Sequence, residues 1–474
     1  MLMVAVASFT LLQSMVIPVL GQLQVSYDTD QATVSWVLTS YLLAASVATP
    51  LLGRLGDVVG KQRMMVVTLA ALSVGSLLAA LAPSVGWLIA ARVVQGAGGG
   101  VLPLSFGIIR DEFPRAKVNG ALSIIASLAA VGFGVGIVIA GPIVDTLGFH
   151  WLFWLPMIVT GVAAAATLLW IPQQRVRGSG RLPLAPAVLL AVWLVAILLG
   201  VSQGNTWGWT SPVVIGLLVG GVALMGVWIW LEHRVRVPLI DMHMMRRRGV
   251  WTTNVVSCCV GFGLFASFGF LPQFLQTPPE AGYGFDASIS ESGWFLVPSA
   301  MASFAIGFVT ARLVRGLGAR TVVTTGALLT GVAFGLIALW HDQAWQIYAW
   351  TTLQGIGSGL VFSSLAGVVI ASVPAGQTGV ASGMNANIRT IGGSLGSAVM
   401  TGIVVGHVGA TGLPSEGGYT IGFLVLAGAM MLAAVAAVFI PDIHDQPDDG
   451  PEESPGDRDA AGADPADVGG LRAA

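Results

Sequence analysis

The sequence predicts an all-α polytopic membrane protein. Of its 474 residues, 55% are hydrophobic and only 9% are charged, whereas soluble proteins carry roughly 25% charged residues. Apolar stretches of about 20 residues, the length that crosses a bilayer core as a helix, recur along the chain. Nearly all lysines and arginines fall in alternate loops between these stretches. Such a composition argues against a soluble enzyme.

Fourteen transmembrane helices are expected. The apolar windows lie near residues 2–24, 34–53, 64–82, 86–109, 119–143, 151–171, 184–202, 212–231, 251–275, 291–313, 321–340, 345–372, 379–405 and 419–440. The first window lacks the basic flank and the small-residue cleavage site of a signal peptide, so we expect it to remain as a helix. Residues 441–474 are rich in Asp, Glu, Pro and Gly and are expected to form an acidic, disordered tail.

The distribution of basic residues predicts the orientation. If the N-terminus is cytoplasmic, nineteen of the 21 lysines and arginines fall in cytoplasmic loops or in the tail. The two exceptions, Arg92 and Arg389, lie inside predicted helices, and the outer loops contain none. We therefore expect a multi-pass protein of the plasma (inner) membrane with both termini in the cytoplasm.

An internal repeat divides the chain into two halves. Similar residues recur at an offset of 258 or 259 positions: Gln95 with Gln354, Gly60 with Gly318, Gly120 with Gly379, and Gly134 with Gly393. A fixed offset indicates two homologous units. We expect an N-terminal six-helix bundle at 1–171, a linker with two inserted helices at 172–250, a C-terminal six-helix bundle at 251–440 and the tail at 441–474.

The segment "GRLGDVVGKQR" (53–63) concentrates charge between the second and third predicted helices. Its glycines allow a tight turn at the membrane surface, and its acid can accept charge-assisted hydrogen bonds from a lysine or a helix N-terminus. The segment resembles a signature of the major facilitator superfamily, in its fourteen-helix drug:proton antiporter branch. The residues that fit the signature are Gly53, Leu55, Gly56, Asp57, Gly60, Lys61 and Arg63.

This resemblance implies a fold and a mechanism. The fold is the major facilitator fold, with two pseudo-symmetric six-helix bundles plus two inserted helices (14 transmembrane helices). The resemblance also implies that Asp57 and Lys61 bond to Asp111 as a conformational latch, which forms when the cytoplasmic side closes. The alternative, that these charges merely follow the positive-inside rule, explains Lys61 and Arg63 but not Asp57.

The fourth predicted helix contains "RVVQGAGGG" (92–100), which resembles the family signature Arg-x-x-Gln-Gly-x-Gly and includes Gln95. An arginine at membrane depth costs roughly 2.5 to 3.5 kcal/mol on insertion scales. We therefore expect Arg92 to face a central cavity and to bond to Gln13 or Ser14 of the first helix. The alternative is that Arg92 extends to the membrane surface.

The fifth predicted helix carries glycines of the family's antiporter signature. Gly132, Gly136 and Gly141 are expected to pack against other helices, and Pro142 is expected to kink the outer end. The signature expects prolines where Phe133 and Ile137 stand, so the motif that marks antiport is weakened. The first helix also lacks the carboxylate common in this branch, because Leu12 aligns with it.

Two later helices supply the remaining candidates for the central cavity. Glu291, at the outer start of the tenth helix, is the candidate proton-coupling carboxylate, and the alternative is an ordinary solvated helix end. Asn385, Asn387 and Arg389 fall close together in the thirteenth helix. Because these groups are costly in lipid, we expect them to line a cavity or a gate. Two arginines without a matching acid favour a neutral or anionic solute.

These features favour a secondary active transporter. The resemblance implies proton-coupled efflux of drugs or small organic metabolites as an antiporter, with the proton gradient as energy source. Open alternatives are a proton-independent exporter or uniporter of a neutral or anionic metabolite, and a non-transporting membrane sensor or scaffold. No enzymatic activity, cofactor, metal or nucleic acid is expected. The partners expected are a small-molecule substrate and the lipid bilayer, and the chain is expected to function as a monomer.

Overall fold

The computed structural model describes residues 1–170, 183–235, 238–374, 377–407 and 413–441. Within these ranges fourteen helical segments are long and apolar enough to cross a membrane, as the sequence predicts. The predicted acidic tail lies outside the described residues from position 442 onward, and so do residue 171 and residues 172–182 of the linker.

The helices of the first half run back and forth through the molecule. They are α1 (Leu2–Met15), α2 (Leu20–Ser26), α3 (Gln31–Val59), α4 (Lys61–Ala80), α5 (Val85–Gln95), α6 (Val101–Glu112), α7 (Arg115–Leu147) and α8 (Trp151–Trp170). Two expected spans are each divided. A 3-10 turn at Ile17–Val19 contains Pro18 and separates α1 from α2, and another at Gly96–Gly100 separates α5 from α6. Proline and glycine runs favour such breaks.

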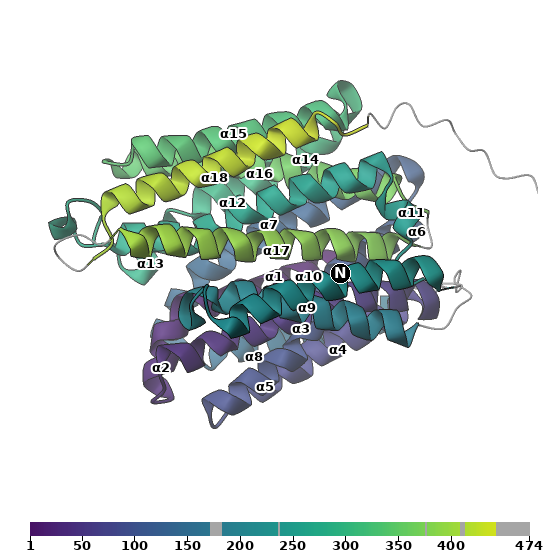
Figure 1. The fold of residues 1–474 in the computed structure, drawn as a ribbon, viewed down its shortest axis with the longest axis horizontal. Helices are drawn as coiled ribbons and strands as arrows, with labels where there is room; N and C mark the ends of the chain where they lie inside the picture. Colours follow the sequence, from purple (N-terminus) through teal and green to yellow (C-terminus); the bar gives the residue numbers. More distant parts are fainter. Residues whose placement is uncertain (171–182, 236–237, 375–376, 408–412, 442–474) are drawn as a thin grey trace, which may run out of the picture.

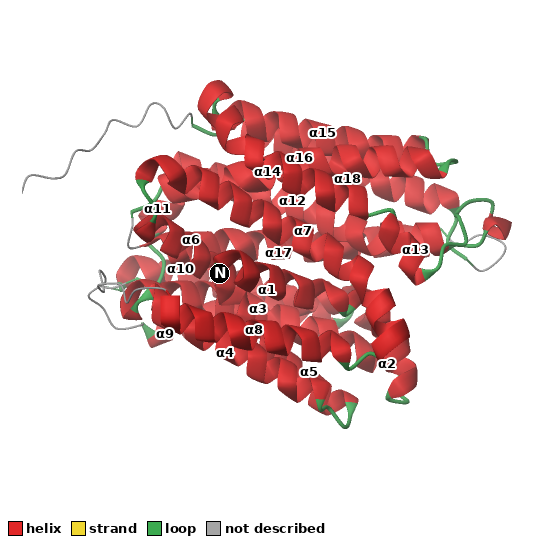
Figure 2. Cartoon of the chain, turned by 180° about the vertical axis from the view of Figure 1, so that it is seen from behind, coloured by secondary structure: helices red, strands yellow, loops and turns green. Residues whose placement is uncertain are grey.

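The insert and the second half follow. The insert contains α9 (Leu184–Trp207), α10 (Pro212–Arg234) and the short α11 (Met242–Met245). The second half contains α12 (Arg248–Gln276), α13 (Ile289–Trp294), α14 (Val297–Leu317), α15 (Ala319–Leu339), α16 (Ala344–Ala371), α17 (Thr378–Gly406) and α18 (Glu416–Ala437). In both views α15 and α18 lie on one side of the molecule and α4 and α5 on the other, with α7 and α17 between them (Figures 1 and 2).

Each half has its own apolar core. One buried cluster is formed almost entirely by residues of α1 to α8, and a second by residues of α12 to α18. A third cluster joins α9 and α10 to the start of α17, with Trp193 and Trp228 in contact at 5.7 Å between ring centroids. The halves meet along two seams, where α7 packs on α14 and α16, and where α3 packs on α17.

The repeat is visible in the turns. Gly60 separates α3 from α4 with φ +114°, and Gly318 separates α14 from α15 with φ +81°. Only glycine adopts such angles without steric cost. These two glycines are one of the pairs that the repeat predicts, so equivalent turns in the two halves depend on the same residue type.

Basic residues gather at one end of the bundle, here called the basic end. The basic end contains the turn between α3 and α4, the end of α6 and the starts of α12 and α17. The helices α2 and α13 lie at the opposite end (Figure 1). Contacts of Arg110 and Arg247 with residues 372–378 hold several of these helix ends together. The expected basic residues Arg175, Arg177, Arg181, Arg236, Arg458 and Arg472 lie outside the described residues.

Candidate functional site

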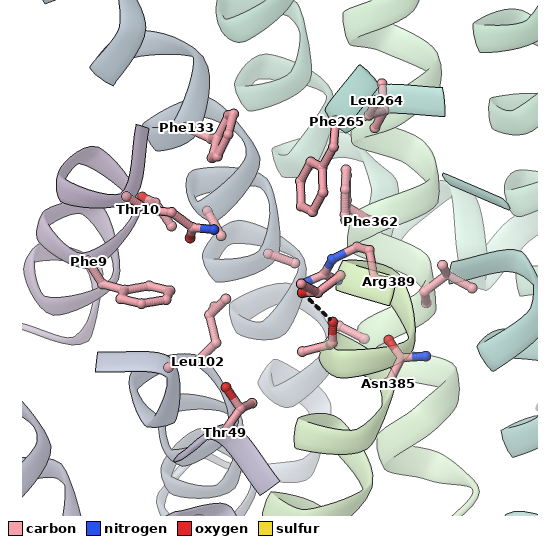
Figure 3. Close-up of a pocket in the computed structure, with 18 of the residues that line it drawn as sticks. Phe9, Thr10, Thr49, Leu102, Phe133, Leu264, Phe265, Phe362, Asn385 and Arg389 are labelled. Atoms are coloured by element: carbon pink, nitrogen blue, oxygen red, sulfur yellow. Dashed lines mark hydrogen bonds between the residues drawn. The ribbon is translucent and has the colours of Figure 1, made fainter. Parts of the chain in front are cut away.

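A cavity of about 130 Å³ lies between the two halves. Its wall is formed by α1, α3, α6 and α7 of the first half and by α12, α14, α16 and α17 of the second. Figure 3 shows side chains of both halves converging on this space. A cavity at the interface of two repeats is the usual position of the substrate site in secondary transporters.

Aromatic side chains dominate the wall. Six phenylalanines line the cavity: Phe9, Phe106, Phe133, Phe265, Phe268 and Phe362. Phe133 of α7 lies 5.6 Å from Phe265 and 5.3 Å from Phe268 of α12, measured between ring centroids, so aromatic contacts join the two halves. Phe133 stands where the family signature expects proline. Phe133 was expected only as a departure from that signature, although an aromatic residue on a glycine-rich helix face also indicates an aromatic contact.

The cluster on α17 lies on the cavity wall. Asn385, Asn387 and Arg389 all line the cavity. The Asn385 amide donates to Asn254 Oδ1 on α12 at 2.9 Å, so it joins two helices of one half. Asn387 Nδ2 donates to the carbonyl oxygen of Ser46 on α3 at 2.7 Å and so joins the two halves.

Arg389 differs from its amide neighbours because no acceptor among the described residues engages it. Its guanidinium carbon lies 5.2 Å from the centroid of the Phe362 ring, and Figure 3 shows the side chain reaching into the central space. Among the described residues that line the cavity it is the one charged group.

Arg92 lies elsewhere, and the expectation that it faces the cavity beside Gln13 or Ser14 is wrong. Arg92 is fully buried inside the first half. Its Nε donates to the Val37 carbonyl oxygen at 3.1 Å, its guanidinium donates to Gln95 Oε1 at 2.7 Å, and its Cζ lies 4.2 Å from the Tyr41 ring centroid. These partners, supplied by α3 and α5, replace part of the water that a buried arginine loses, and Arg92 Nη2 has no hydrogen-bond partner among the described residues.

The same placement excludes extension of Arg92 to the membrane surface. Gln95 does not line the cavity either, because its amide donates to Ser76 Oγ at 3.0 Å within the first half. Gln13 does line the cavity. Ser14 is buried and donates to the Thr10 carbonyl oxygen of its own helix at 3.2 Å. Tyr41, two helices away in sequence, is the partner that the sequence analysis missed.

The glycines of α7 lie at close helix contacts. A Cβ on Gly132 would collide with the Thr10 hydroxyl, and one on Gly136 would collide with the Ser14 hydroxyl, so both glycines pack on α1. A Cβ on Gly141 would stand 2.5 Å from Ser290 Oγ beside α13 of the other half. Pro142 lies within α7 near its C-terminal end.

The latch residues meet at the basic end. Lys61 Nζ lies 2.6 Å from Asp111 Oδ2 and 3.7 Å from Asp57 Oδ1. Lys61 and Asp57 are buried, with 6% of each residue exposed. Asp57 also faces the first turn of α17, because a Cβ on Gly379 would stand 3.2 Å from Asp57 Oδ2. Burial of a lysine and an acid together is costly unless they pair, so the cluster is a specific arrangement rather than a solvated loop.

Contacts between the halves surround these residues. Arg110 donates to Thr378 Oγ1 at 2.6 Å and to the Val373 carbonyl oxygen at 2.9 Å, both in the second half. A Cβ on Gly53 would stand 2.5 Å from the carbonyl oxygen of Gly379, so the α3 and α17 backbones touch. Arg110 was not among the expected site residues, although it is adjacent to Asp111. Arg63 lies exposed at the start of α4.

Glu291 is not in the cavity, and its expected place there is wrong. It belongs to a capping box at the start of α13, where Glu291 Oε2 accepts from the Ser288 backbone amide at 2.8 Å. The residue is exposed. Glu291 is therefore part of an ordinary solvated helix start, the alternative considered for it. The sequence Ser-Ile-Ser-Glu (288–291) matches the capping-box pattern.

The comparisons with known proteins agree with this architecture. The model of the Major Facilitator Superfamily matches residues 2–397 and 255–467. The chain is 32% identical to the cephamycin export protein CmcT of Amycolatopsis lactamdurans, covering 86% of this chain and 85% of the relative. It is 27% identical to the multidrug resistance protein B homolog of Mycobacterium tuberculosis, covering 79% and 70%.

A solved structure shares the fold. The crystal structure of the human organic anion transporter MFSD10 (TETRAN) superposes with a TM-score of 0.65 at 17% identity, covering 92% of this chain and 96% of that one. The two bundles, the cavity between them and the match over most of the sequence lead to one assignment: the chain belongs to the Major Facilitator Superfamily, whose members are transporters rather than enzymes.

Proposed function

We propose that this chain exports small organic solutes across the plasma (inner) membrane by alternating access, with the basic end in the cytoplasm. The orientation follows from the concentration of lysine and arginine at that end. The direction is supported by relatives whose names describe export, namely CmcT and the tetracenomycin C resistance and export protein of Streptomyces glaucescens.

One observation carries the proposal: the inter-half contacts at the basic end lie directly beyond the cavity wall. Along α3 the wall residue Thr49 is followed one turn later by Gly53, and along α17 Gly379 precedes the wall residue Ser382. The seam therefore closes the cavity toward the basic end. Its hydrogen bonds from Arg110 and its glycine contacts can break and re-form in each cycle.

The latch residues fit this role. The Lys61 and Asp111 pair lies within the first half, whereas Asp57 lies between that pair and the first turn of α17. When α17 moves away, Asp57 loses the positive end of a helix dipole and Lys61 remains as its partner. A sensor or scaffold without transport has no use for such a cluster beside a cavity.

The energy source has two candidates. The proton gradient is the source that the family resemblance implies. The cavity wall, as far as the structure describes it, contains neither Asp nor Glu, so a proton would have to bind outside the substrate site. This observation favours the second candidate, a proton-independent exporter of a neutral or anionic solute.

The test is transport into inside-out vesicles. Labelled anionic, neutral and cationic aromatic solutes are offered with and without a pH gradient, and wild type is compared with Asp57→Asn and with Asp145→Asn. Asp145 is an exposed acid at the outer end of α7 and serves as the matched control. We expect uptake by wild type and by Asp145→Asn, and at least tenfold slower uptake by Asp57→Asn. Binding of solutes by purified protein without any uptake would contradict the proposal.

A further inference from the structure

The two arginines inside the membrane region differ in one respect. Arg92 has two hydrogen bonds and a tyrosine ring, all within the first half. Arg389 has only the Phe362 ring, and no ion pair joins it to a carboxylate within the described residues. The fold thus supplies partners for one guanidinium and leaves the other open toward the cavity.

Arg389 is too deep to find water at a membrane surface. It lies 11 residues from the first residue of α17 and 17 residues from the last, which corresponds to roughly 17 Å and 26 Å along the helix. A cation at such depth is costly unless it meets an anion or acceptors. The guanidinium therefore needs acceptors inside the cavity, and these are either water or a ligand that replaces it.

Neighbouring polar groups are already engaged. Asn385 donates to Asn254 and accepts from Ser257 Oγ at 3.1 Å. Asn387 donates to the Ser46 carbonyl oxygen, and the Thr390 hydroxyl donates to the Ala386 carbonyl oxygen at 3.1 Å. These bonds hold the wall around Arg389 in place. The hydroxyls of Ser46, Ser303 and Ser382 also line the cavity without a described hydrogen-bond partner, but Arg389 is the one charged donor on the described wall.

Aromatic side chains from both halves determine the rest of the ligand's chemistry. Phe9 of α1 and the Phe133, Phe265 and Phe268 group provide apolar aromatic surface around the remaining space. Figure 3 shows Arg389 on the α17 side and Phe9 and Phe133 across from it. A ligand that fills this space is apolar over most of its surface and carries an acceptor at one end.

We propose that the cavity binds an amphipathic organic monoanion, whose acidic group pairs with Arg389 and whose aromatic or aliphatic body lies between the phenylalanines of the two halves. This inference rests on the proposed function and names its substrate class. A cation would be repelled by Arg389 and would find no described acid on the wall. A dianion would bring a second charge that the described wall leaves unpaired.

The charge of the ligand also supplies a driving force. A membrane potential that is negative in the cytoplasm favours export of a monoanion by a free energy of about 2.3 kcal/mol per 100 mV. A tenfold concentration ratio across the membrane corresponds to about 1.36 kcal/mol. Uncoupled export of a monoanion therefore yields about tenfold outward accumulation for each ~60 mV. An exporter of this kind needs no titrating carboxylate in its cavity, which agrees with the described wall.

Binding is tested with three probes of one shape. The probes are 2-naphthalenesulfonate, 2-naphthalenesulfonamide and 2-naphthyltrimethylammonium, titrated calorimetrically against the purified full chain. We expect wild type to prefer the sulfonate over the ammonium probe. Arg389→Gln is expected to weaken sulfonate binding roughly 10- to 100-fold, because a hydrogen bond to a charged group is lost, and to leave sulfonamide binding within threefold. Arg389→Lys keeps the charge and is expected to retain most of the affinity.

Controls separate this inference from the proposed function. Arg312→Gln removes an exposed arginine of α14 and should bind all probes like wild type. If Arg389→Gln fails to fold, the preference of wild type for the sulfonate over the ammonium probe and the affinity of Arg389→Lys for the sulfonate still test the anion site. Equal affinity for the sulfonate and ammonium probes, or no sulfonate binding, would overturn the anion site. Uptake of the cationic or neutral probe that does not depend on Arg389 would overturn the anion site and leave the proposed export standing. Binding of the sulfonate without its uptake would overturn export alone.

Discussion

Replacing Gly53 by alanine should shift the protein away from the conformation in which the basic end is closed. A Cβ at this position would stand 2.5 Å from the carbonyl oxygen and 2.7 Å from the carbonyl carbon of Gly379. Both atoms belong to backbone and cannot rotate away, so α3 and α17 must separate by roughly 1 Å to restore van der Waals contact. Overpacking of this kind costs about 1 to 3 kcal/mol, which changes the ratio of closed to open molecules about 5- to 150-fold.

The assay is the distance between the two halves at the basic end. Spin labels at Phe113 and Arg315, both exposed, report the separation by pulsed electron resonance in a chain whose Cys258 and Cys259 are replaced by serine. We expect Gly53→Ala to add a population at longer distance. Gly120→Ala is the matched control, because a Cβ there meets nothing within 4 Å. An unchanged distance distribution in folded Gly53→Ala would refute the reasoning.

Three further outcomes follow from the geometry. A double-mutant cycle of Lys61→Met and Asp111→Asn should give a coupling of about 0.5 to 3 kcal/mol in thermal unfolding, since the two charges lie 2.6 Å apart and mostly buried; additive effects would contradict the pairing. Arg92→Lys should lower stability by about 2 to 4 kcal/mol through loss of the Val37, Gln95 and Tyr41 contacts, measured by unfolding in detergent. Glu291→Gln should leave transport and its pH dependence within twofold of wild type, because glutamine preserves the cap; uncoupling by this variant would restore Glu291 as a coupling residue.

The sequence predicts the transmembrane helices well because the bilayer imposes a strong constraint. A spanning helix must be long, apolar and internally hydrogen-bonded, and each of these properties is visible in one local window. The interruptions at Pro18 and at Gly96–Gly100 were not predicted. Their residues were visible, but whether a proline or a glycine run bends a helix or breaks it depends on the neighbouring helices.

The candidate site was only partly predictable. Asn385, Asn387 and Arg389 were expected at a cavity and line one, because polar groups in an apolar helix have few other places to lie. Arg92 was misplaced by the same rule, since Tyr41 and the Val37 carbonyl oxygen form a second kind of polar environment inside one bundle. Which of the two environments receives an arginine depends on the rotation of its helix, and a single sequence does not reveal it.

The placement of Arg92 has a mechanical consequence for alternating access. Its partners all belong to α3 and α5, and Gln95 extends the network to Ser76 of α4, so every contact lies within the first half. The halves can therefore rock against each other without disturbing this arginine. In the proposed cycle, the contacts that break are those at the seam, where Arg110 meets Thr378 and Gly53 meets Gly379. Stability and conformational exchange thus depend on different residues, so Arg92→Lys should lower the unfolding temperature without moving the distance distribution, and Gly53→Ala should move the distribution with a smaller loss of stability.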